Sequence, residues 1–255
     1  TGALDVAGNT TFNTGTGIIT LDNTGNSFTK DLIFTSAGTT SLTDSSLIRL
    51  GTSTITGGLK LTTGGNISQI GVVKVSGITE FNSISTVNDY EIDLGLNNDF
   101  GGLVKATKVS SLKLKDINDL SLDAITLVAG AVAPNGNIDV TATDKIILNG
   151  NLDSSAATTK NITLNGNVEI ASNTVVNAGT DATAGTISFT GTKNSNDATA
   201  KNLTLTGGTI DVTGNVGALH KLGDFEINSS GVVTFANITA KSFDVSTTNC
   251  FTALN

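Results

Sequence analysis

The chain has 255 residues, of which 38% are hydrophobic, 14% charged and 4% aromatic, and its net charge is −8. The apolar fraction is too high for a disordered chain. Sparse helix formers beside abundant Thr, Val, Ile, Gly and Asn argue against a helical bundle. Only 14 basic residues are present and they form no basic stripe, which argues against binding to nucleic acid. We expect residues 1–255 to form a single domain.

Short apolar–polar–apolar triplets run along the whole chain and predict β-strands, with two side chains pointing inward and one outward in each. In chain order they are 4–6, 19–21, 59–61, 73–75, 92–94, 112–114, 120–122, 138–140, 162–164, 168–170, 187–189, 203–205, 210–212, 225–227, 233–235 and 243–245. Strands this short, about 6 to 12 residues apart, are typical of a three-faced parallel β-helix (β-solenoid) with about 20 residues per rung. Around twelve rungs at about 4.8 Å each would make a rod roughly 60 Å long.

The chain also repeats itself at an offset of about 70 residues, which indicates stacked units that cannot bury their apolar face alone. Gly25-Asn26-Ser27-Phe28 aligns with Asn97-Asn98-Asp99-Phe100. Further on, the aligned pairs are Leu32 with Val104, Leu42 with Leu114, Asp44 with Asp116, Ile48 with Leu120, Leu50 with Leu122 and Ile55 with Leu127. The repeating residues are structural in type, so the repeat describes shape rather than chemistry.

Turns are expected between these strands. Asn135-Gly136, Asn149-Gly150 and Asn165-Gly166 can accept positive φ, and we predict that they form corners of the coil. Asn and Thr side chains at equivalent corners would form hydrogen-bonded ladders along the rod. The regular spacing of the triplets is interrupted by two polar stretches, Thr190–Lys201 and Gly217–Gly223 with His220. We interpret both as lengthened corners, with a ligand-contacting protrusion as the alternative for the first.

Residues suited to catalysis or to metal binding are few. Alternation places Asp89, Glu91 and Asp93 on one outer face, which makes them weak candidates for a calcium or glycan surface beside the simpler interpretation as a solvated face. A second carboxylate group consists of Asp116, Asp119 and Asp123. Arg49 lies within an ordinary strand pattern, and one His with one Cys cannot form a zinc centre. We therefore predict no enzyme activity, no cofactor and no metal.

Four further features bear on context. The chain contains no Met, which indicates a processed or excised piece of a longer protein. Its longest apolar run, around 125–133, is too short to span a bilayer. Cys250 cannot form an internal disulfide and is interpreted as a small buried residue, with a bond to a partner as the alternative. The lysines at 105, 108, 113 and 115 are interpreted as one solvated face.

Two long phrases, 18–70 and 187–245, resemble the repeats of large bacterial exoproteins of the filamentous-haemagglutinin type and of autotransporter-like passenger regions. The resemblance extends over essentially the whole chain and also includes 91–128. It implies a right-handed parallel β-helix, export through an outer-membrane secretion pore, and work at the bacterial cell surface as an adhesive or spacing stalk. The secretion-signal region of that family is not recognisable in this chain.

Two functions are compatible with these observations. The first is a secreted, non-catalytic rod that contacts a host-cell, glycan or matrix surface, where weak contacts multiply through many copies. The second is a structural subunit that joins copies of itself end to end into a filament, sheath or surface layer through open β-helix edges. Neither requires nucleic acid or insertion into a membrane.

Overall fold

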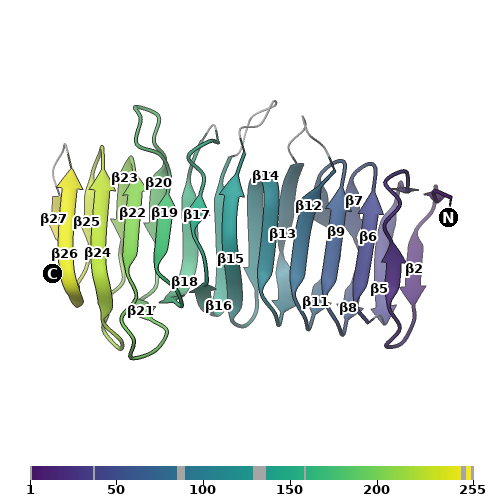
Figure 1. Cartoon of the computed structure of the whole chain (residues 1–255), viewed down its shortest axis with the longest axis horizontal. Coiled ribbons are helices and arrows are strands. Elements are labelled where there is room, and N and C mark those ends of the chain that lie inside the picture. The colour runs from purple at the N-terminus through teal and green to yellow at the C-terminus, as the bar shows by residue number, and fades with distance from the viewer. Residues whose placement is uncertain are drawn as a thin grey trace.

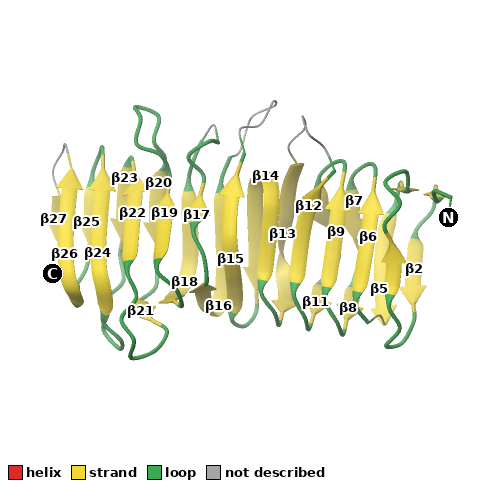
Figure 2. Ribbon diagram, in the orientation of Figure 1, coloured by secondary structure: helices red, strands yellow, loops and turns green. Residues whose placement is uncertain are grey.

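The computed structural model describes residues 2–36, 38–84, 90–128, 136–157, 159–247 and 251–253. All regular structure in this described part is β-strand (Figure 2). The strands are β1 Asp5–Val6, β2 Thr10–Asn13, β3 Ile19–Leu21, β4 Ser27–Phe28, β5 Asp31–Ser36, β6 Thr40–Asp44, β7 Ile48–Leu50, β8 Ser53–Ile55, β9 Leu59–Thr63, β10 Ile67–Gln69, β11 Val73–Val75, β12 Thr79–Ser83, β13 Tyr90–Phe100, β14 Val104–Asp116, β15 Leu120–Leu127, β16 Ile138–Leu148, β17 Leu152–Asp153, β18 Ile162–Ile170, β19 Thr174–Asn177, β20 Thr186–Phe189, β21 Lys193–Ser195, β22 Leu203–Gly207, β23 Thr209–Val212, β24 Leu222–Ser229, β25 Val233–Phe235, β26 Ala240–Thr247 and β27 Phe251–Ala253.

These strands stack in parallel as a β-solenoid of about 10 turns, and the chain enters at one end of the rod and leaves at the other (Figure 1). The predicted β-helix is therefore confirmed. Two turns fewer than the expected twelve are present, so the rod is about 50 Å rather than 60 Å long. The reason is rung length. Partner residues lie 18 positions apart between β5 and β7 but 29 apart between β19 and β22.

The register of the strand pairs defines three faces. Face 1 contains β7, β10, the first parts of β13, β16 and β18, the second part of β14, and β20, β23, β25 and β27. Face 2 contains β8, β11, the second parts of β13, β16 and β18, the first part of β15, and β21. Face 3 contains β3, β6, β9, β12, the first part of β14, the second part of β15, and β17, β19, β22, β24 and β26.

The core is a set of stacked apolar columns inside these faces. One column on face 1 is almost entirely β-branched, which suits the pleated backbone, because each side chain packs directly on its partner in the next rung. None of its members is more than 1% exposed; they are Ile48, Ile67, Ile92, Leu112, Ile138, Ile162, Ile187, Ile210 and Val233. No helix among the described residues is long and apolar enough to cross a membrane.

Asparagines at the starts of strands connect successive rungs. The Oδ1 atoms of Asn151, Asn161 and Asn167 accept hydrogen bonds from backbone N–H groups one rung further on, at 2.8, 2.8 and 3.1 Å. Asn66, Asn173 and Asn202 do the same. These bonds satisfy N–H groups where the chain turns and the sheet ladder is interrupted.

Candidate functional site

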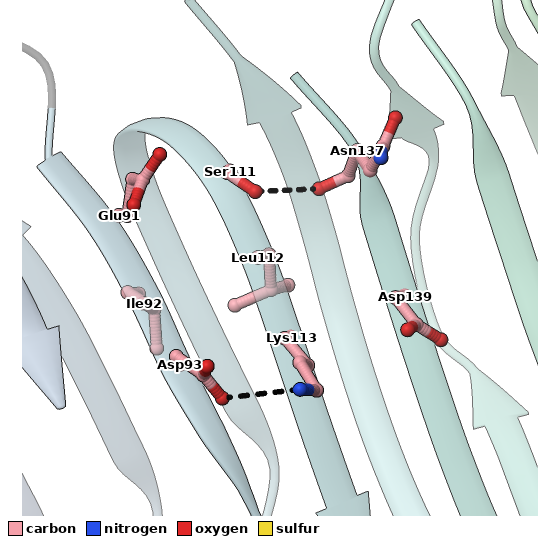
Figure 3. A pocket seen from close by; sticks show the side chains of 8 residues that line it. All are labelled: Glu91, Ile92, Asp93, Ser111, Leu112, Lys113, Asn137 and Asp139. Carbon is pink, nitrogen blue, oxygen red and sulfur yellow. Dashed lines mark hydrogen bonds and ion pairs between the residues drawn. The ribbon is translucent and has the colours of Figure 1, made fainter. Parts of the chain in front are cut away.

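A concave polar surface lies on face 1 (Figure 3). It consists of two adjoining depressions of about 310 and 260 Å³ that share Asp93 and Lys113. We call them together the face-1 groove. Its lining residues are Ser68, Gln69, Glu91, Ile92, Asp93, Gly95, Leu96, Ser111, Leu112, Lys113, Asn137 and Asp139. Strands β10, β13, β14 and β16 supply most of these side chains.

The floor of the groove follows from strand register. Ser68, Asp93, Lys113 and Asp139 are partners in successive rungs, and each occupies the outward position of its triplet. Lys113 Nζ lies 3.7 Å from Asp93 Oδ1. The Lys113 side chain extends over Gly95, where a Cβ atom would lie only 2.8 Å from Lys113 Cε. Glycine at position 95 therefore makes room for the lysine.

The surroundings of Asp139 shift its pKa. Burial raises the pKa of Asp139, and the Asp93 carboxylate raises it further, whereas Lys113 lowers it. The side chains of Asp93 and Lys113 are more than half exposed, so water screens their ion pair and its contribution to stability is small. The groove thus combines one ammonium group with three carboxylates, and it contains no aromatic side chain on which a sugar ring could stack.

Alternation of charge from rung to rung is not confined to the groove. On face 3, Lys60, Glu80 and Lys105 are successive register partners. On face 2, Lys145 Nζ lies 3.6 Å from Asp119 and 3.2 Å from Glu169. Opposite charges on neighbouring strands favour one register over a slipped one. Much of the surface charge is therefore explained by the stacking of the coil.

The structure places the predicted calcium or glycan candidates as follows. Asp89 lies outside the described residues. Glu91 and Asp93 share the outer face, as alternation predicted, and both line the groove. Within the described ranges, no three His, Cys, Asp or Glu side chains are grouped so that they could hold a metal ion.

The second carboxylate group is dispersed rather than assembled. Asp116 is fully buried and accepts backbone hydrogen bonds, while Asp119 pairs with Lys145 and Asp123 with Lys105. The sequence interval between these aspartates covers a corner, so their side chains lie on different sides of the coil. Arg49 pairs with Asp31 in the rung below, and His220 Nδ1 lies 3.3 Å from the Ser195 carbonyl oxygen. Cys250 lies outside the described residues.

The predicted Asn-Gly turns differ in their geometry. Asn149-Gly150 forms the bend between β16 and β17, where a Cβ on Gly150 would lie 2.4 Å from the Ala124 nitrogen. Asn165-Gly166 lies inside β18, and Gly166 has a φ of +145° at the change from face 1 to face 2. Gly136 is buried just before β16, and Asn135 lies outside the described residues.

The polar stretch 190–201 is not a simple protrusion, because its middle forms β21, a rung strand that pairs with β18. Lys193 takes the inward position on β21 and is fully buried between Val168 and Val216. Its Nζ donates to the carbonyl oxygens of Phe189 at 3.1 Å, Gly191 and Gly214. The interpretation of this stretch as a lengthened corner was wrong for residues 193–195, because a lysine in an inward position breaks the apolar pattern that predicts strands.

A second buried ammonium group, on Lys160, organises the loop between β19 and β20. Lys160 has a φ of +58°, and its Nζ lies 2.8 Å from Asp181 Oδ2 and 3.0 Å from Thr183 Oγ1. The hydrogen bond from Lys160 to Asp181, together with those from Thr183, lowers the pKa of Asp181 to about 2. Neither lysine is distinguished by the sequence pattern: Lys193 begins β21 within a polar stretch, and Lys160 lies two residues before β18.

The stacked parallel strands define this protein as a repetitive β-solenoid. Residues 1–35 and 37–107 match a family model described as repeats of unknown function (DUF5649). The second matched segment spans 71 residues, close to the offset at which the chain repeats itself. No curated protein and no solved structure matches the chain.

Proposed function

We propose that this chain is a non-catalytic, secreted or cell-surface β-helical rod that works as an adhesin stalk or passenger region. The observation that carries the proposal is the rod itself: about 10 turns share one continuous core, while long polar faces remain exposed. Such a body supplies reach and a repetitive surface. Weak contacts along that surface gain strength through multiple copies.

The resemblance to filamentous-haemagglutinin-type exoproteins and autotransporter-like passengers supports the same proposal and adds a location. On this resemblance the rod would lie outside the bacterial cell, after export through an outer-membrane pore. Its partner would be a host-cell, glycan or matrix surface. The face-1 groove is the preferred contact region, because it combines concavity with hydrogen-bonding groups from several rungs.

A second candidate is a self-assembling subunit of an extracellular filament, sheath or surface layer. Phe243 on β26 favours it, because its ring stacks on buried Phe225 at 5.4 Å and yet is 40% exposed. An exposed aromatic ring on β26 is suited to packing against a further rung, which a second copy could supply. Strand edges at the end of a solenoid also invite pairing with another chain.

Negative-stain electron microscopy across a concentration series tests both candidates. Discrete rods of one length at every concentration support the stalk, whereas fibres that lengthen with concentration support the subunit. Binding of the rods to arrays of glycans and matrix proteins then tests adhesion. Loss of binding in Lys113→Gln, with Lys60→Gln on face 3 as the control, would locate the contact in the groove. Rods that bind no surface in these arrays would contradict the adhesin proposal.

A further inference from the structure

One hydrogen-bond network occurs twice in the rod, at two aspartates 72 positions apart. Asp44 Oδ2 accepts the Phe28 N–H at 3.0 Å, and Asp116 Oδ2 accepts the Phe100 N–H at 2.7 Å. Oδ1 of each aspartate accepts the N–H two residues further on, at 2.8 and 2.7 Å. Both aspartates are 0% exposed.

The environment beneath each aspartate also corresponds. The residue after Asp44 donates its N–H to the Asn26 carbonyl at 2.7 Å, and the residue after Asp116 donates to the Asn98 carbonyl at 3.0 Å. Both asparagine side chains are buried, and each donates through Nδ2 to backbone carbonyl oxygens nearby. The sequence repeat is therefore a repeat of a complete corner.

These two corners nevertheless lie on different edges of the coil. Asp44 ends β6 on face 3, where the chain turns to face 1. Asp44 pairs with Thr63 in the next turn, and Thr63 pairs with Ser83 in the turn after that. In the third turn, face 3 is formed by the first part of β14. Asp116 lies one face further along the chain, where β14 leaves face 1 for face 2.

We infer that the repeating unit of 72 residues advances the coil by three and one-third turns, so that each unit begins on the face after the one on which its predecessor began. Two further aligned pairs agree: Leu42 on face 3 corresponds to Leu114 on face 1, and Ile48 on face 1 to Leu120 on face 2. These two corners of the coil accept the same residues because each presents the same backbone groups to the rung beneath it.

The inference has a consequence for recognition. Many inward and corner residues match between units, whereas several outward ones differ: Ser41 corresponds to Lys113, and Arg49 to Ser121. An outward residue that two units share, such as Thr54 and Thr126, lies on the next face in the following unit. In a longer rod of such units, a partner that contacts one face would meet such a shared residue once in every three units, about 50 Å apart.

A tandem duplication of residues 45–116 within the full chain tests this. Every new corner would then contain its aspartate, asparagine and backbone donors, so we expect a folded, longer rod with an unchanged melting temperature. The control duplicates residues 48–111, which are three whole turns and leave each face in place. The control would place Thr52 where Asp116 belongs, and we expect a melting temperature lower by about 2 to 10 °C. A control duplication as stable as the first would overturn the inference.

Point variants provide a second test that does not depend on duplication. Asp44→Ala and Asp116→Ala should lower the melting temperature by similar amounts, because the two carboxylates accept the same backbone hydrogen bonds on different edges. Asp144→Ala, at an exposed aspartate, is the control and should change it little. A loss in one buried variant but not in the other would contradict the equivalence of the corners.

Discussion

Because the Lys193 side chain is buried, we predict that the stability of this rod depends on pH in an unusual range. Burial lowers the pKa of Lys193 from 10.5 to about 8, against a smaller opposing effect of Asp211. The difference between these values corresponds to about 3 kcal/mol. Lys193 binds its proton more tightly in the unfolded chain than in the folded one. The folded state therefore lacks this contribution of about 3 kcal/mol below pH 8. The free energy of unfolding then rises as the pH increases from about 8 to 10.5.

Lys193→Met isolates this contribution. Methionine keeps the length of the side chain and removes both the charge and the three hydrogen bonds to carbonyl oxygens. The loss of those hydrogen bonds destabilises the variant, whereas the removal of a buried ammonium group stabilises it. The unfolding free energy at a single pH therefore does not isolate the effect of the charge. The change with pH is diagnostic. Between pH 7 and pH 10 the wild-type protein should gain about 2 to 3 kcal/mol of unfolding free energy relative to the variant.

Urea denaturation at both pH values, followed by circular dichroism, measures this difference. Other titrating groups, including Tyr90 whose pKa is raised by burial, are common to both proteins and cancel. Lys74→Met is the matched control, because Lys74 is exposed and pairs with Asp99 at the surface. A wild-type-to-variant difference that stays constant from pH 7 to pH 10 would refute the reasoning.

Three further predictions concern packing and charge. Leu205→Asp, at a fully buried inward position, should unfold neighbouring rungs and lower the melting temperature strongly. Glu226→Ala, at an outward position in the next rung, should lower it little. Equal losses would contradict the assignment of inward and outward positions. Gly150→Ala should destabilise the rod, because the new Cβ would lie 2.4 Å from a backbone nitrogen of the adjacent rung. Gly8→Ala, with open space around it, should be neutral in the same thermal melt. Asp139→Asn should raise the melting temperature at pH 7, because a carboxyl group with a raised pKa favours the fold only when protonated. That gain should disappear below about pH 4, and a pH-independent gain would argue against it.

What the sequence by itself determined is the repeating interior. Triplets such as Ile92-Asp93-Leu94 specify two buried side chains and one exposed side chain, and no flat sheet can bury so many short strands. Rung length and the roles of polar residues were decided only in the tertiary structure. Lys193 is buried because the carbonyl oxygens of Gly191 and Gly214 converge on its ammonium group from two successive rungs. Asp93 and Lys113 meet because a register of 20 residues stacks them, and that register depends on the lengths of the intervening corners.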